Sequence, residues 1–150
     1  MSIASEVPMW EYEHSIEVAD VTPAQVWARY SDTATWPEWD KGIVSVTLDG
    51  PFVAGTTGTM RPEGQDPLPF TLTEAVPDQG FTDETVIPDA VTLRFVHRLA
   101  ALPGGGTRIT HRLEIEGPAA AGMGPELGPQ ITEDFPDAMQ ALAKVAGQVG

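Results

Sequence analysis

The sequence predicts an α+β domain in which a curved antiparallel sheet of seven strands closes over a long C-terminal helix. Residues 10–18 alternate between apolar and polar side chains, which is the period of a half-buried strand. Residues 43–117 form short β-rich runs separated by turn residues, as in an antiparallel meander. Residues 119–149 repeat apolar side chains every three or four positions, as expected for a helix that buries one face.

The first strand and the two short helices after it follow from local signals. The strand directs one set of side chains inward: Trp10, Tyr12, His14, Ile16 and Val18. Residues 22–25 have the pattern of a capping box with Pro23 in the first turn, so a short helix is expected over residues 23–31. A second short helical piece is expected over residues 33–40.

Six further strands and the C-terminal helix complete the predicted order. The strands are expected at Ile43 to Leu48, Thr56 to Arg61, Phe70 to Val76, Phe81 to Ile87, Val91 to Ala101 and Thr107 to Gly117. The apolar stripe of the helix is Met123, Leu127, Ile131, Phe135, Met139, Leu142 and Val145. Pro136 predicts a kink near the middle of this helix, because proline lacks a backbone donor and presses on the carbonyl of Thr132.

Length and composition indicate one soluble domain, residues 1–150, with 41% hydrophobic and 20% charged residues and no apolar run of bilayer length. Residues 1–8 lack the charge and apolar run of a targeting signal, so a cytoplasmic location is expected. The absence of cysteine excludes disulfides, thiolate metal sites and cysteine nucleophiles. No phosphate-binding, dinucleotide-binding, serine hydrolase or His-Glu-x-x-His motif occurs, so no cofactor is expected.

The formal net charge of −14 argues against binding to nucleic acid or insertion into an anionic membrane. The basic cluster consists of Arg94, Arg98, Arg108 and Arg112. We expect these arginines to pair with Glu114, Glu116 and other acids on the outer face of the sheet, without a functional role.

Three segments carry a family resemblance: Trp36–Asp40 after the first helix, Thr110–Pro118 at the last strand, and Phe135–Ala138 in the final helix. Together with the order of elements, they resemble the polyketide cyclase/dehydrase family of the START/Bet v 1-like (SRPBCC) superfamily. The resemblance implies a helix-grip fold whose sheet wraps the C-terminal helix around a cavity for lipids, polyketides or other hydrophobic compounds. Some members of such a family are cyclases or dehydratases, whereas others only bind ligands, so the fold does not fix the function.

All three histidines, His14, His97 and His111, fall on the apolar face of their own strand. If the last hairpin has the five-residue loop 102–106, its ladder sets His97 opposite His111, with Cβ atoms about 4.5 to 5.5 Å apart. In the resembling fold the first strand lies beside the last, which implies that His14 joins the pair.

Several interpretations of these histidines are open. In the first, they are buried neutral residues whose ring nitrogens form hydrogen bonds with each other, with Tyr12 or with water. In the second, they are polar anchors in a cavity. In the third, they act as a general acid and base for proton transfer next to a carbonyl. A three-histidine zinc site is a further alternative. We expect no bound metal. His97, His111 and His14 are the catalytic candidates.

Further ligand contacts are predicted at Tyr12, Phe95, Phe135, Met139, Thr73 and Glu84. The choice of Glu84 depends on register: a two-residue turn at residues 88–89 directs Glu84 inward, whereas a one-residue shift directs Asp83 inward instead. The segment 61–68, rich in proline and glycine, is either a flap over the cavity or a hairpin end.

The sequence therefore favours binding of a small hydrophobic or amphipathic molecule of lipid, polyketide or aromatic type in a cavity between sheet and helix. A cyclase or dehydratase that uses the histidines is the alternative, and a protein-interaction domain with an acidic face is a minor one. A monomer or a weak homodimer is expected.

Overall fold

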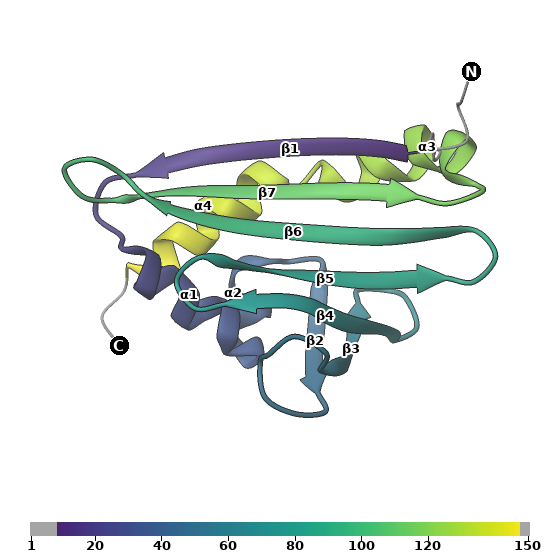
Figure 1. Cartoon of the computed structure of the whole chain (residues 1–150), viewed down its shortest axis with the longest axis horizontal. Helices are drawn as coiled ribbons and strands as arrows, with labels where there is room; N and C mark the ends of the chain where they lie inside the picture. The colour runs from purple at the N-terminus through teal and green to yellow at the C-terminus, as the bar shows by residue number, and fades with distance from the viewer. Residues whose placement is uncertain (1–8, 148–150) are drawn as a thin grey trace, which may run out of the picture.

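The computed structural model describes residues 9–147 and contains one seven-stranded antiparallel sheet, as predicted (Figure 1). Its strands are β1 (Met9–Val18), β2 (Ile43–Leu48), β3 (Thr57–Pro62), β4 (Leu68–Val76), β5 (Gly80–Ile87), β6 (Val91–Ala101) and β7 (Thr107–Glu116). The helices are α1 (Pro23–Ser31), the 3-10 turn η1 (Thr33–Thr35), α2 (Trp36–Trp39), α3 (Ala120–Thr132) and α4 (Phe135–Ala146). The expectation about residues 1–8 lies outside the described residues.

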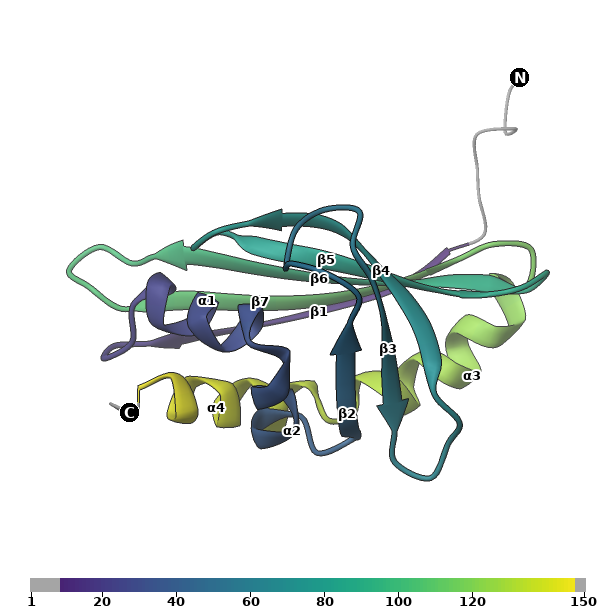
Figure 2. The same ribbon diagram turned by 90° about the horizontal axis from the view of Figure 1, so that it is seen from below.

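The strand order is β1-β7-β6-β5-β4-β3-β2, so the first strand pairs with the last and the other neighbours are joined by hairpins. The sheet curves strongly, and every helix lies on its concave side (Figure 2). Register shifts at Ile43/Ser45 and at Leu72/Glu74 interrupt two ladders, and such bulges increase the bend of a strand. The segment 61–68 spans the β3–β4 hairpin end.

The predicted capping box at α1 is confirmed. The Thr22 hydroxyl accepts a hydrogen bond from the backbone N–H of Gln25, and the Gln25 side chain accepts one from the backbone N–H of Thr22. The expected second helical piece is also present, as η1 followed by α2. Trp36 and Trp39 of α2 are buried in the core that lies beneath α1 and α4.

The C-terminal helical segment lies along the concave face as two consecutive helices, α3 and α4 (Figure 2). The break falls at residues 133–134, just before Phe135, and Pro136 lies in the first turn of α4. The kink predicted from Pro136 is therefore a complete break, because proline fits the start of a helix better than its interior.

Glycines on α3 allow that helix to approach β1 closely. The buried positions of α3 are Ala120, Gly124, Gly128 and Thr132, which form one ridge. A Cβ atom at Gly128 would come within 2.5 Å of the Trp10 ring, and one at Gly124 would overlap the Trp10 Cβ atom. The indole of Trp10 therefore packs on a helix surface that only glycine leaves free.

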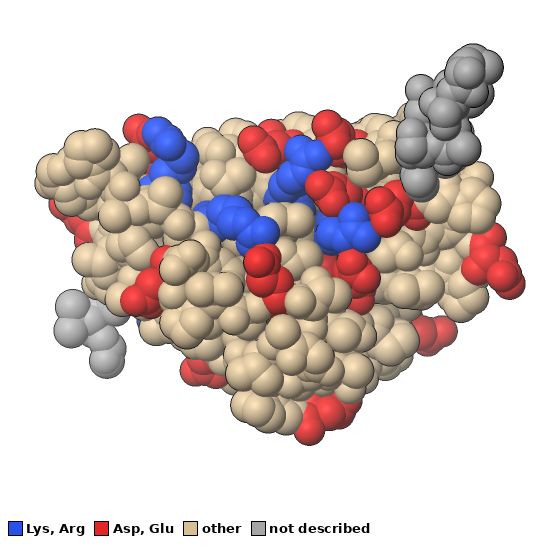
Figure 3. Space-filling view, viewed as in Figure 1, with Lys and Arg blue, Asp and Glu red and all other residues tan. Residues whose placement is uncertain are grey.

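The outer face of the sheet carries the predicted ion pairs. Arg94 on β6 contacts Glu84 at 2.7 Å, Glu114 at 2.9 Å and Glu116 at 2.8 Å, and Arg112 pairs with Glu114 at 2.8 Å. Basic and acidic side chains alternate across this face (Figure 3). Within residues 9–147, no helix combines the length and apolar character that crossing a bilayer requires.

Candidate functional site

The three histidines lie in one row across the concave face, because the ladders place His97 opposite His111 and His111 opposite His14. The predicted hairpin register is confirmed, with Ala101 opposite Thr107. The rings of His97 and His111 are 4.6 Å apart between centroids and meet edge to face. Phe81 on β5 completes the row beside His97.

The side chain of Tyr30 on α1 contacts this row at His111. Its hydroxyl oxygen lies 2.8 Å from Nε2 of His111, and both side chains are buried. Burial raises the pKa of Tyr30, so the phenol keeps its proton. Tyr30 was not among the site residues predicted from the sequence. Val26 and Tyr30, four positions apart, are the buried residues of α1, and this helical spacing indicates burial but does not show which strand residue Tyr30 meets.

His97 is held as a neutral imidazole. Its Nδ1 donates to the carbonyl oxygen of Phe81 at 3.2 Å, and its ring stacks on the Phe81 ring at 3.9 Å. Burial is the main cause that lowers the pKa of His97 to about 3. The pKa of His111 is also lowered well below its ordinary value, first by burial and then by His97 and His14 nearby.

A second row runs parallel to the first along the sheet. Pairing across β5, β6, β7 and β1 sets Asp83 beside Phe95, Phe95 beside Leu113, and Leu113 beside Tyr12. Asp83 is therefore the carboxylate that faces inward, because the β5–β6 turn pairs Ile87 with Val91.

The prediction that Glu84 faces the ligand is wrong. Glu84 points to the outer face and forms an ion pair with Arg94, since the turn is one residue longer than the favoured register assumed. The prediction for Thr73 is also wrong. Thr73 is exposed at the β4 bulge, which turns its hydroxyl toward the carbonyl oxygen of Thr82 at 3.4 Å.

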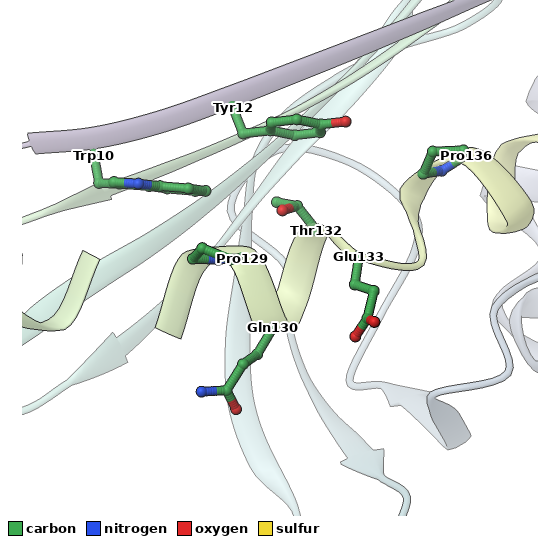
Figure 4. Close-up of a pocket in the computed structure, with 7 residues that line it drawn as sticks. All are labelled: Trp10, Tyr12, Pro129, Gln130, Thr132, Glu133 and Pro136. Atoms are coloured by element: carbon green, nitrogen blue, oxygen red, sulfur yellow. The ribbon is translucent and has the colours of Figure 1, made fainter. Parts of the chain in front are cut away.

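An open hollow of about 520 Å³ lies between β1 and the break in the C-terminal helical segment (Figure 4). Its lining comprises Trp10, Tyr12, Pro129, Gln130, Thr132, Glu133 and Pro136. The Trp10 and Tyr12 rings form its wall on β1, whereas the side chains of Gln130 and Glu133 point away from them (Figure 4). Tyr12 was predicted as a ligand contact, whereas the other lining residues were not.

Phe135 separates this hollow from the histidine row. Its ring lies 5.8 Å from the Tyr12 ring on one side and 6.2 Å from the His111 ring on the other. None of the three histidines lines the hollow, contrary to the expectation that they face the cavity directly. Met139, also predicted as a ligand contact, is fully buried in the core under α4.

The histidines do not form a metal centre in this arrangement. Within the described part of the chain, no group of three or more histidine or carboxylate side chains lies close enough together to hold a metal ion. What His97 and His111 offer instead is a pair of neutral hydrogen-bonding groups in an apolar surrounding.

Residues 9–147 match a family described as polyketide cyclase / dehydrase and lipid transport. The chain belongs to this family. No curated protein matches the chain at a significant level. The sequence-based resemblance is therefore confirmed at the level of the family and the fold.

Solved structures show a similar fold. Ara h 8.0201 matches with a TM-score of 0.72 and 13% identity, over 92% of this chain and 97% of that one. Norcoclaurine synthase from Thalictrum flavum, in complex with dopamine and hydroxybenzaldehyde, matches with a TM-score of 0.72 and 14% identity, over 97% and 91%. The di-domain ARO/CYC BexL from the BE-7585A biosynthetic pathway matches with a TM-score of 0.77 and 13% identity, over 99% of this chain and 53% of that one.

This member of the family thus combines a Bet v 1-like helix-grip fold with one inward-facing row that contains the three histidines and a second, mainly apolar row that runs from Asp83 to Tyr12. The row that contains the histidines is covered by Tyr30 and Trp39, whose rings lie 5.9 and 6.1 Å from that of His111. The row that contains Asp83 ends at Tyr12, on the wall of the hollow.

Proposed function

We propose that this protein binds a small apolar molecule that carries one or more hydrogen-bonding groups, and that the molecule enters at the hollow between β1 and the α3–α4 break. The observation that carries the proposal is the hollow itself, whose 520 Å³ lies within the range of about 300–1,000 Å³ typical of ligand sites. Its aromatic wall provides a large apolar contact surface.

A ligand that moves from the hollow into the interior would have to pass the Phe135 side chain. It contacts the buried clusters on both sides of the molecule and is itself only half buried. The break at residues 133–134 leaves Phe135 at the start of α4, where the ring is less constrained than in a helix interior. Because the Phe135 ring lies between the rings of Tyr12 and His111, we infer that its rotation would open a path from one to the other.

The buried neutral imidazoles of His97 and His111 suit this function as hydrogen-bonding anchors. A neutral imidazole accepts at one nitrogen and donates at the other, so it orients a hydroxyl or carbonyl group without burying a charge. Dopamine and hydroxybenzaldehyde, bound by norcoclaurine synthase of the same fold, illustrate the size and polarity of such molecules.

The experiment combines native mass spectrometry of the purified protein with titration of the fluorescent probe 1-anilinonaphthalene-8-sulfonate. We expect a retained small molecule or saturable probe binding, and we expect Tyr12→Ala to weaken the binding about tenfold through loss of aromatic contact. Tyr12→Phe is the matched control, because it keeps the ring. Absence of binding to the wild-type protein, or unchanged binding by Tyr12→Ala, would contradict the proposal.

A second candidate function is a cyclase or dehydratase reaction in which His111 transfers a proton next to a carbonyl group. The observation that favours it is the 2.8 Å hydrogen bond between Tyr30 and His111, with His97 adjacent. Because burial keeps His111 neutral, its imidazole is able to accept a proton from a substrate held beside it. This reaction requires the substrate to pass Phe135.

A further inference from the structure

Two polar side chains on the inward face of β5 lack partners. Asp83 is 8% exposed and Thr85 is 1% exposed. Thr85 Oγ1 is buried without a hydrogen bond, and within residues 9–147 the Asp83 carboxyl meets no hydrogen-bond donor or cation. The two residues are separated by one position on a strand, so their side chains leave the sheet on the same side.

The neighbours of this pair across the strands are apolar. Asp83 lies between Leu72 of β4 and Phe95 of β6, and Thr85 lies opposite Leu93. Valine or leucine would fill such positions without cost, whereas an unpartnered buried carboxyl or hydroxyl destabilises the fold. Uncompensated polar groups of this kind are typical of sites that receive a hydrogen-bonding partner from outside.

The ladders connect this pair to the hollow. The row that starts at Asp83 ends at Tyr12, and the row that starts at Thr85 passes Leu93 and Ile115 and ends at Trp10. Tyr12 and Trp10 form the β1 wall of the hollow. Because neighbouring strands are about 4.8 Å apart, the three steps from β5 to β1 put the pair about 14 Å from that wall along the sheet, which is about the length of an elongated molecule of three rings.

We propose that Asp83 and Thr85 anchor the far end of the bound molecule by hydrogen bonds to an uncharged oxygen, a phenolic hydroxyl or a ring carbonyl. This inference rests on the proposed function and names the chemical class of its ligand. The apolar rings and side chains between Tyr12 and Asp83 then contact the carbon skeleton.

An uncharged oxygen fits better than an ammonium group. Burial, with a smaller contribution from Glu84, raises the pKa of Asp83 to about 8, so the carboxyl is protonated at neutral pH. A protonated carboxyl donates one hydrogen bond and accepts another, and the threonine hydroxyl does the same. The pair therefore satisfies a hydroxyl or carbonyl oxygen without separating charge in an apolar interior.

The test compares the affinities of three probes that share one naphthalene ring system, measured by calorimetry at pH 7: naphthalene, 2-naphthol and 2-naphthylmethylammonium. For the wild-type protein we expect 2-naphthol to bind at least tenfold more tightly than naphthalene. For Asp83→Leu we expect 2-naphthol to fall to the affinity of naphthalene, and naphthalene to bind at least as well as before. Thr85→Val, which keeps the shape of the side chain, should cause a smaller loss for 2-naphthol alone.

Asp83→Asn is the matched control, since its amide retains a donor and an acceptor and should keep most of the preference for 2-naphthol. Thermal unfolding of the ligand-free variants provides a second readout, in which Asp83→Leu and Thr85→Val should unfold at higher temperature than the wild type. Equal affinity of the wild type for naphthalene and 2-naphthol, or tighter binding of 2-naphthylmethylammonium, would overturn the anchor alone. Absence of binding of all three probes would overturn the proposed function as well.

Discussion

His97 and His111 face each other across β6 and β7 with ring centroids 4.6 Å apart, and each is fixed by a different partner. His97 donates to the Phe81 carbonyl, whereas His111 shares a hydrogen bond with the Tyr30 hydroxyl. Burial keeps both rings neutral at physiological pH. The pair consequently places hydrogen-bonding groups in the core without placing a charge there.

Tyr30→Phe should lower the free energy of unfolding by about 1–3 kcal/mol, because Nε2 of His111 loses its buried partner while the packing of the ring is kept. Chemical denaturation monitored by tryptophan fluorescence measures this change. Tyr12→Phe is the control, since the Tyr12 hydroxyl makes no hydrogen bond within the described residues and its ring is only half buried. A loss as large in Tyr12→Phe would contradict the assignment.

Stability should decrease as the pH falls below about 6.5. The unfolded chain protonates His97 near its ordinary pKa of 6.5, whereas the folded chain does so only near its pKa of about 3. In that window the unfolded state binds more protons, so the free energy of unfolding falls by about 1.4 kcal/mol per pH unit for this group. His97→Gln should make the pH dependence between 6.5 and 4 shallower, and parallel curves for the two proteins would count against a buried neutral His97.

Alanine at Gly128 should destabilise the fold by about 1–3 kcal/mol, because its Cβ atom would collide with the Trp10 ring. Gly122→Ala on the same helix has free space around the new atom and should instead stabilise by up to about 1 kcal/mol through helix propensity. Thermal unfolding of the two variants measures the contrast. Equal effects of both substitutions would show that Trp10 does not pack on α3 as described.

The double variant His97→Gln/His111→Gln distinguishes binding from catalysis. If the protein is a carrier, affinity for 2-naphthol should change by less than about tenfold, because glutamine retains a donor and an acceptor. If it is an enzyme, kcat should fall by about 10²–10⁴-fold with little change in KM. A substrate that is turned over at an unchanged rate would end the catalytic hypothesis.

Much of the fold was predictable because its signals are local. The alternation in β1 and the capping box before α1 depend only on neighbouring residues, and both were confirmed. The register of the last hairpin was predictable too, since the glycine-rich loop after Ala101 fixes which residues pair and so places His97 opposite His111. Turn chemistry was less decisive at Pro88–Ala90, where a shift of one residue exchanged Asp83 for Glu84 on the inner face.

The sequence by itself determined the order of elements, the inward phase of the three histidines and the family. Only the tertiary structure decided that Tyr30 meets His111, that Phe135 lies between the histidines and the hollow, and that the Asp83 row ends at Tyr12. These relationships join residues from elements far apart in the chain. Periodicity shows which face a side chain occupies, whereas the packing of one element on another decides which side chain it meets there.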